Sequence, residues 1–284
     1  MYERVDKILK MAEKSNTSVI SFVCMDFIMA RTVAKAAEAT NTPAIIMLYP
    51  THIAIRQAGT KQGYAAAAKD LANEVKVPIG LHMDHDFSYD AVKDSINKGF
   101  DSVMMDASMN DLEENIRLTR EVVDMAHKMN VVVEGELGHV GMAAKDDNKD
   151  EDLFTNPDMA SRFCKETNVD ALAISIGNAH GKYSATPNLD MKRLEDIRIA
   201  TNTPLVLHGG SGIPDDQLLE AFSKGIRKFN LGTEYMGEYF KVLSGYTEQY
   251  KDDENPIKIT EMPIYVQTQL QPYVENRLKV LCKF

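Results

Sequence analysis

Two histidines and two aspartates stand close together in the segment His82-Met-Asp-His-Asp86, directly after an apolar run over residues 77–81. A strand of an all-parallel sheet is covered on both faces, so its polar residues gather at its carboxyl end. The segment therefore predicts an imidazole metal ligand beside a carboxylate that can move a proton. The alternative is an ordinary turn into a helix, with Asp86 or Ser88 as its cap.

Three histidines follow three different predicted strands, namely His85, His180 and His208. If the strands form a barrel, their carboxyl ends meet at one rim and the three imidazoles can share one ion. Three protein ligands with open positions for water or substrate are typical of a catalytic zinc site. A single histidine at a rim is more often a hydrogen-bonded polar residue, but three at independent strand ends favour the metal.

Other polar residues are candidates for supporting roles. His82 is an alternate ligand or a partner of the ligands. Asp106 and Glu136 also end predicted strands, where carboxylates orient ligating imidazoles or offer a second metal position, unless they only solvate the rim. The remaining histidines are poorer candidates because they lie in loops or inside a predicted helix: His52, His127 and His139.

A glycine-rich stretch over residues 207–214 follows the seventh predicted strand, and Asn230-Leu-Gly-Thr233 follows the eighth. Glycines let the backbone approach an anion, hydroxyls of Ser211 and Thr233 can donate, and Pro214 begins a helix whose amino end would face the site. The pattern predicts a phosphate site beside His208. A metal next to a phosphate suggests a phosphorylated substrate, whose carbonyl the metal would polarise to stabilise an enediolate while Asp84 moves a proton.

These residues need a scaffold, and the chain alternates short β-branched runs with amphipathic stretches, as repeated βα units do. The predicted strands are Val19–Cys24, Ala44–Leu48, the stretch from Val77 to Asp86, Ser102–Met105, Val131–Glu134, Ala171–Ile176, Leu205–Leu207 and Arg227–Leu231. The predicted helices are Phe27–Ala39, Gln62–Val75, Tyr89–Lys98, Leu112–Lys128, Pro157–Glu166, Met191–Thr201 and Asp215–Lys224.

This inventory predicts a single (β/α)8 barrel over residues 1–284, with a doubly wound open sheet as the rival fold. Residues 255–284 are expected to form a helical tail, broken near Pro256, Pro263 and Pro272, that packs on the barrel or on a neighbouring subunit.

The composition fits an ordinary globular protein of 284 residues, with 44% hydrophobic and 26% charged residues. A net charge of -10 argues against nucleic acid or an anionic membrane as the main partner. The 3 cysteines are widely spaced and suggest reduced thiols in the cytoplasm. The first residues are charged where a signal peptide needs an apolar run, and no apolar stretch is long enough to cross a bilayer.

Taken together, the motifs resemble those of the class II, zinc-dependent ketose-bisphosphate aldolases, nearest to the tagatose-bisphosphate branch. The matching segments are 82–85, 134–138, 173–181, 204–214 and 230–233. The resemblance implies zinc on His85, His180 and His208, and Asp84 as proton donor to the oxygen of the cleaved carbon. It also implies dihydroxyacetone phosphate bound by Gly181, Gly209, Gly210, Ser211, Asn230, Leu231, Gly232 and Thr233. A monovalent cation (Na⁺ or K⁺) near Gly181 and Gly209 and a homodimer or homotetramer are implied as well.

The chain departs from the family pattern at three places. Ser21-Phe-Val23 stands where the family has Ala-Phe-Asn, and Asp106-Ala-Ser-Met109 where it has Asp-Gly-Ser-His. The loop Gly141-Met-Ala-Ala-Lys-Asp-Asp147 has no glutamate in register with the family's enediolate-forming base, leaving Asp146 or Asp147 as substitutes. The half of the site that takes the metal and the ketone phosphate is intact, whereas the half that takes the acceptor aldehyde is altered.

The first hypothesis is therefore a metal-dependent aldolase that cleaves a ketose (bis)phosphate of the fructose or tagatose type into dihydroxyacetone phosphate and an aldehyde such as glyceraldehyde 3-phosphate. The alternatives are an aldolase-like binding or regulatory subunit with little turnover, and a barrel metallohydrolase acting on sugar phosphates. A Schiff-base aldolase using Lys182 is a weaker fourth reading.

Overall fold

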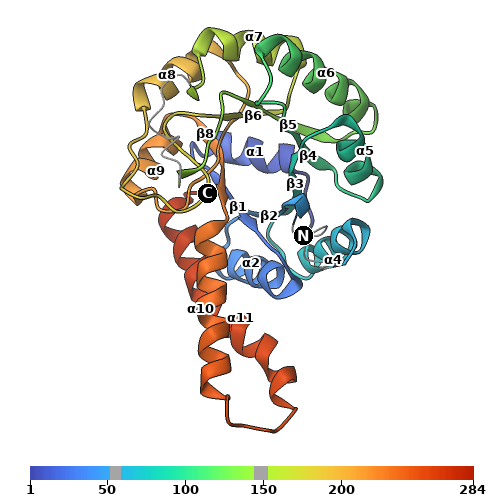
Figure 1. Cartoon of the computed structure of the whole chain (residues 1–284), viewed down its shortest axis with the longest axis vertical. Helices are drawn as coiled ribbons and strands as arrows, with labels where there is room; N and C mark the ends of the chain where they lie inside the picture. The colour runs from blue at the N-terminus through green and yellow to red at the C-terminus, as the bar shows by residue number, and fades with distance from the viewer. Residues whose placement is uncertain (52–58, 144–152) are drawn as a thin grey trace.

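Eight parallel strands close into one barrel in the order β1 to β8, which confirms the predicted (β/α)8 fold and excludes the open sheet (Figure 1). The computed structural model describes residues 1–51, 59–143 and 153–284. The strands are β1 (Val19–Val23), β2 (Ala44–Leu48), β3 (Ile79–Asp86), β4 (Ser102–Met105), β5 (Val132–Leu137), β6 (Ala171–Ile174), β7 (Leu205–Leu207) and β8 (Ile226–Leu231). Pairing of β1 with β8 closes the ring.

Helices surround the barrel and cover the outer faces of the strands (Figure 1). Around the barrel lie α2 (Phe27–Thr40), α4 (Lys61–Asn73), α5 (Tyr89–Asn97), α6 (Leu112–Lys128), α7 (Pro157–Thr167), α8 (Met191–Ala200) and α9 (Asp215–Ser223), and the chain ends with α10 (Thr233–Gln249) and α11 (Lys258–Leu281). Of the two candidate caps after β3, Ser88 is the one used, since its hydroxyl accepts from the amide of Ala91. None of the helices in these described ranges is long and apolar enough to span a membrane.

An additional helix, α1 (Val5–Lys14), precedes the barrel and was not predicted. Its apolar residues Val5, Ile8 and Leu9 join a buried cluster with inward-facing strand residues such as Ile45, so the helix fills the amino-terminal end of the barrel. Gly80 on β3 makes room for it: a Cβ there would lie 3.0 Å from Val5 and 3.1 Å from Ile8. The spacing of the buried residues is that of an amphipathic helix, so the sequence pattern could have predicted α1.

Above this apolar layer the barrel interior is polar. His82, Glu134 and Lys228 are each at most 2% exposed, and each stands two residues before a residue of the upper rim. Because strand side chains alternate with a period of two, they point into the barrel just beneath that rim. The barrel therefore has an apolar base, a buried polar layer and a functional rim.

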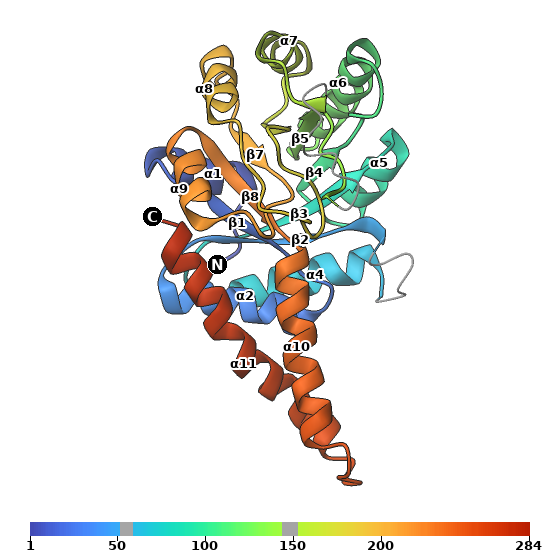
Figure 2. The ribbon, with the colours of Figure 1, turned by 60° about the vertical axis from the view of Figure 1, so that its left-hand side comes forward.

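The C-terminal tail is helical as predicted, but the expected breaks at Pro263 and Pro272 are wrong, because α11 runs through both. An interior proline costs about 3 kcal/mol in a helix. Here buried residues at intervals of four, including Val266, Leu270 and Val274, hold the helix together. The tail packs against α2 and α10, and with α10 it forms an arm that projects from the barrel (Figures 1 and 2).

Candidate active site

The end of β3 breaks the rule that consecutive strand residues point to opposite faces. Asp84 and His85 are neighbours, yet both line the same cavity at the carboxyl end of the barrel. The register between β3 and β4 shifts between Met83 and Asp86, and His85 has a φ of 42°. A bulge with one residue in the left-handed region re-aims a side chain, so this distortion turns His85 inward beside Asp84.

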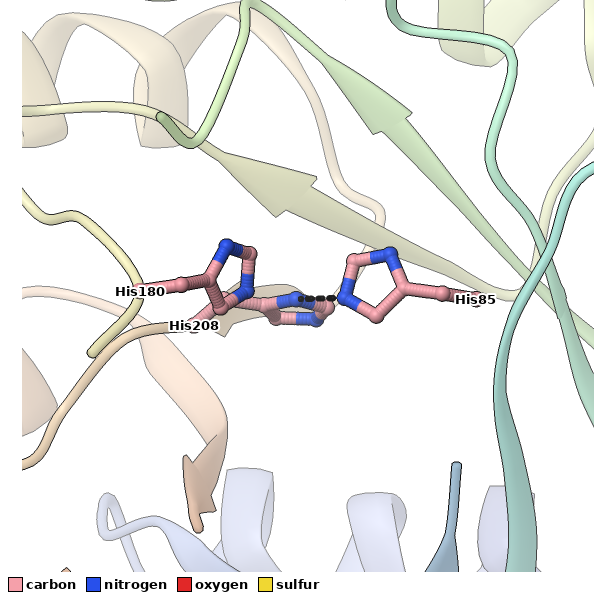
Figure 3. Close-up of side chains that lie close together, drawn as sticks. All are labelled: His85, His180 and His208. Atoms are coloured by element: carbon pink, nitrogen blue, oxygen red, sulfur yellow. Dashed lines mark hydrogen bonds between the residues drawn. The ribbon is translucent and has the colours of Figure 1, made fainter. Parts of the chain in front are cut away.

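The three predicted ligands meet at this rim. Ligand nitrogens of His85, His180 and His208 all lie within 4.8 Å of one another, and their rings face a common point (Figure 3). Nε2 of His85 lies 3.1 Å from Nδ1 of His208. Two nitrogens bound to one tetrahedral zinc at 2.0–2.1 Å stand roughly 3.3 Å apart, so this spacing fits a shared ion.

Each imidazole is oriented by a partner at its other nitrogen. Asp106 contacts Nδ1 of His85 at 2.8 Å, the carbonyl of Val140 accepts from Nδ1 of His180 at 3.1 Å, and Glu134 contacts Nε2 of His208 at 2.8 Å. These contacts leave Nε2 of His85, Nε2 of His180 and Nδ1 of His208 directed at the shared point. Ligating histidines in metal sites are held in this way, so the donor set fits zinc.

The supporting carboxylates differ from the sequence prediction in one respect. Asp106 does orient His85, but the partner of His208 is Glu134, which was not a candidate. Glu136 acts on His180 instead: its Oε1 accepts from the amide of Val140, whose carbonyl holds the ring. The sequence could have indicated a role for Glu134, because side chains alternate along a strand and residues 134 and 136 of β5 therefore face the same side.

Burial and charged neighbours shift the pKa values of the clustered groups in opposite directions. Burial alone would lower the pKa of His85, but Asp84 and the hydrogen bond to Asp106 outweigh it and raise that pKa to about 10. Burial, reinforced by His85 and His208, lowers the pKa of His180 to about 3. Burial would raise the pKa of Asp84, but the neighbouring histidines His85 and His208 outweigh it and lower that pKa.

The ligands open into a cavity of about 420 Å³. All but one of the predicted phosphate-binding residues line it, namely Gly181, Gly209, Gly210, Ser211, Asn230, Gly232 and Thr233. The helix whose amino end reaches the cavity is α10, beginning at Thr233, and the hydroxyl of Ser211 accepts from the amide of Glu234 in its first turn. A helix amino end with free amides is an anion site. The predicted helix after Pro214 forms as α9, but neither Pro214 nor any α9 residue lines the cavity.

Close packing requires the two glycines after His208. Gly209 has a φ of +63°, and a Cβ on it would lie 2.1 Å from the carbonyl oxygen of Ala179. A Cβ on Gly210 would lie 1.8 Å from the ring of Phe229. Asn178 ties the same loops together, since its Nδ2 donates to the carbonyl of His208 at 3.1 Å.

The comparison with known proteins agrees with this geometry. A family model described as "Fructose-bisphosphate aldolase class-II" matches residues 3–283. The chain belongs to the class II fructose-bisphosphate aldolase family. It is therefore a metal-dependent carbon–carbon lyase that acts on a phosphorylated sugar.

Solved structures of aldolases resemble the chain over nearly its full length. The YdjI aldolase from Escherichia coli K12 is 29% identical, with 99% of this chain and 98% of that chain covered and a TM-score of 0.85. A proposed fructose-1,6-biphosphate aldolase from Coccidioides immitis is 26% identical, with 98% and 96% covered and a TM-score of 0.83. Fructose-bisphosphate aldolase from Campylobacter jejuni is 20% identical, with 99% and 95% covered and a TM-score of 0.82, and shows the shared fold.

Four residues named in the sequence analysis lie apart from the cluster of His85, His180 and His208. Leu231 is fully buried and does not line the cavity, so only its backbone can contact a substrate. His82 lies beneath the rim, with Nδ1 2.8 Å from the hydroxyl of Ser102, and does not line the cavity either. Lys182 is exposed and does not line the cavity, which argues against a Schiff base. His139 lines the cavity wall but is not among the clustered donors.

Two stretches named in the sequence analysis lie outside the described residues. They contain His52 and the substitute bases Asp146 and Asp147.

Replacing one ligand should remove the metal. His180→Ala is expected to lower zinc affinity by more than the roughly 10- to 100-fold that loss of a ligand's partner costs. His127→Ala is the control, because His127 lies in α6 and pairs with Asp170 at 3.0 Å, away from the cavity. Zinc content after desalting, measured by atomic emission, checks both variants. Equal zinc in His180→Ala and wild type would contradict the assignment.

Proposed function

We propose that the protein cleaves and forms ketose phosphates whose C1 carries the phosphate, of the fructose- or tagatose-1,6-bisphosphate type. The products of cleavage are dihydroxyacetone phosphate and an aldehyde such as glyceraldehyde 3-phosphate. The observation that carries the proposal is one cavity in which the nitrogens of His85, His180 and His208 lie beside the glycine loops over residues 209–211. Three free, buried cysteines support a cytoplasmic location, where thiols stay reduced.

The residues of the cavity would have two separate roles, metal binding and phosphate binding. A zinc ion on the three histidines would act as a Lewis acid toward the substrate carbonyl and the adjacent hydroxyl. Backbone amides at Gly209, Gly210 and the start of α10 hold the phosphate and fix the position of the ketone end. A monovalent cation beside Gly181 and Gly209 stays a prediction.

Asp84 is the group that moves the proton. It lines the cavity next to His85, and one of its oxygens accepts a hydrogen bond from Asn230 at 3.2 Å. In cleavage it would take the proton of the hydroxyl on the carbon that becomes the aldehyde, and in condensation it would return that proton. Asn230, which also belongs to the phosphate end, keeps the carboxylate aligned with the bound ketone phosphate.

The acceptor end of the cavity has a different character. Its described wall around the ends of β2 to β5 includes Tyr49, Phe87, Met109 and Met142. These apolar groups stand at the half of the site where the sequence departs from the family pattern. The stereochemistry of the sugar and the choice of aldehyde depend on this wall.

A cleavage assay tests the proposal. We expect metal-loaded protein to release dihydroxyacetone phosphate from at least one member of a panel of ketose 1-phosphates and 1,6-bisphosphates of fructose and tagatose configuration. A chelator should abolish turnover and zinc should restore it. Turnover that survives complete metal removal would refute the zinc mechanism. Release of inorganic phosphate instead would favour a metallohydrolase that acts on sugar phosphates. Binding of the sugar phosphate without cleavage would favour a regulatory subunit.

Removing the carboxylate of Asp84 should slow chemistry without emptying the metal site. Asp84→Asn keeps an oxygen for Asn230 but cannot exchange a proton, so we expect kcat to fall by about 10²- to 10⁴-fold. Zinc content should equal that of wild type. Asp90→Asn, at an exposed position at the start of α5, is the control and should keep full activity. A kcat close to the wild-type value in Asp84→Asn would assign proton transfer to another group.

We also propose that the protein is a homo-oligomer, a dimer or tetramer, and that the arm of α10 and α11 contributes to the contact between subunits. Large apolar side chains stand exposed along this arm: Phe240 is 71% exposed, Ile259 68% and Ile264 71%. Exposed apolar patches of this kind mark contact surfaces. A cluster of Tyr246, Tyr250 and Tyr265 stiffens the arm near its end.

A charge on the arm should therefore shift the oligomer toward the monomer. Ile264→Glu is expected to lower the mass measured by size-exclusion chromatography with light scattering. Ile199→Glu, at an equally exposed position on α8, should leave the mass unchanged. A wild-type protein that elutes as a monomer would rule out the oligomer. An unchanged mass in Ile264→Glu would show that the contact between subunits does not involve this part of the arm.

A further inference from the structure

A lysine lies at the centre of the barrel, where charged groups are rarely found. Lys228 on β8 is 0% exposed, and its Nζ donates to Oε2 of Glu134 at 2.9 Å. This is the one hydrogen bond of the Lys228 side chain within the described part of the chain. A buried ammonium carries a large desolvation cost that only a close, well-aligned partner offsets. The cost suggests that Lys228 serves a purpose other than stability.

The pair continues directly to the metal ligands. The second oxygen of Glu134 contacts Nε2 of His208 at 2.8 Å, and Nδ1 of the same ring faces His85. Lys228, Glu134 and His208 thus form one line of contacts from the barrel interior to the ion position. Which nitrogen of an imidazole carries the proton is set by the group at the other nitrogen.

The same two-step arrangement supports the other two histidines. Asp106, which orients His85, accepts from the amide and the hydroxyl of Ser108. Val140, which orients His180, donates its amide to Glu136. In each case the group that contacts the ligand is itself held by a further residue. For Glu134, which is 2% exposed, that residue is Lys228.

We propose that Lys228 is a positioning residue of the metal centre, acting through Glu134 to fix the ring orientation and the tautomer of His208. This inference rests on the proposed zinc site and goes beyond it, since Lys228 touches neither the metal ligands nor the cavity.

A competing contact explains why the carboxylate needs the lysine. Nε2 of His82 is buried without a hydrogen-bond partner and lies 3.8 Å from Oε2 of Glu134. With Lys228 removed, Oε2 loses its donor, and a small rotation brings it to His82. That rotation draws the other oxygen away from His208, so the ring is free to turn and the ion loses one well-placed nitrogen.

The test compares two buried cations on the same strand. Lys228→Met and Arg227→Met each remove a side chain at most 5% exposed that is paired with a glutamate. Arg227 points to the opposite face and contacts Glu13 and the carbonyl of Phe222. We expect Lys228→Met to weaken zinc binding by about 10-fold, the lower end for outer partners of metal ligands, and Arg227→Met to keep wild-type affinity. Competition with a chromophoric chelator measures both.

A second readout separates positioning from general loss of stability. Cobalt(II) bound at the three histidines reports their geometry through its visible absorption bands. These bands should shift in Lys228→Met and stay unchanged in Arg227→Met. If Lys228→Met does not fold, Lys228→Gln replaces it, because its amide still donates to Glu134, and its zinc affinity is expected to fall below that of wild type by less than 10-fold.

The double variant Lys228→Met with Glu134→Gln tests whether the lysine acts through the glutamate. The neutral amide oxygen of glutamine accepts from Nε2 of His208 and needs no counter-charge, so most of the lost affinity should return. Non-additivity of this kind identifies a coupled pair. Three results would overturn the inference: wild-type affinity and spectrum in Lys228→Met, an equal loss in Arg227→Met, or a larger loss in the double variant. Failure of the wild type to bind zinc would instead refute the metal site itself.

Discussion

The site depends on one distortion of one strand. A regular β3 would send Asp84 and His85 to opposite faces, placing either the carboxylate or the imidazole outside the barrel. The bulge between Met83 and Asp86, with the left-handed backbone at His85, brings both into the cavity. Backbone strain of this kind persists where its surroundings hold it. Here Asp106, directly after the adjacent strand β4, holds the His85 ring, and the proposed proton-transfer group becomes a direct neighbour of a proposed metal ligand.

The charged side chains inside the barrel, beneath Asp84 and His85, are each paired with a partner of opposite charge or a hydrogen-bonding group. Glu134 and Lys228 offset one another below the rim, and Asp106 and Glu136 face His85, His180 and the loop that holds them. Because the surroundings are dry, each misplaced or missing partner would be costly. The acidic groups thus define a place for a cation, while helix α10 and the glycine loops define a place for an anion beside it.

Much of the fold and the ligand set could be predicted from the sequence. The alternation of strands and helices is strong in this chain, and a parallel barrel gathers the strand ends at one rim, so the meeting of His85, His180 and His208 could be predicted without coordinates. The glycines beside His208 likewise pointed to the loops that line the cavity. The partner of His208 could not be assigned with the same ease, because Glu134 and Glu136 are both strand residues of one face and only the depth of each in the barrel separates their roles.

Other features could not be predicted from the sequence, because they depend on packing between elements that are distant along the chain. Helix α1 is amphipathic, but its position inside the barrel end depends on the space left by Gly80. The continuity of α11 through two prolines depends on contacts with α2 that a local pattern does not contain. Lys228 has the residue type of a surface position, and only its period-two relation to Asn230 on β8 indicates that it points into the barrel.

The position of α1 has a consequence for how an ion or a sugar reaches the cavity. Within the described residues, Val5, Ile8 and Leu9 close the amino end of the barrel, so a metal ion and a sugar would both enter through the cavity at the opposite end. A sugar phosphate bound in that cavity would stand between the proposed ion position and the solvent, so a metal ion there would exchange more slowly while the sugar is bound.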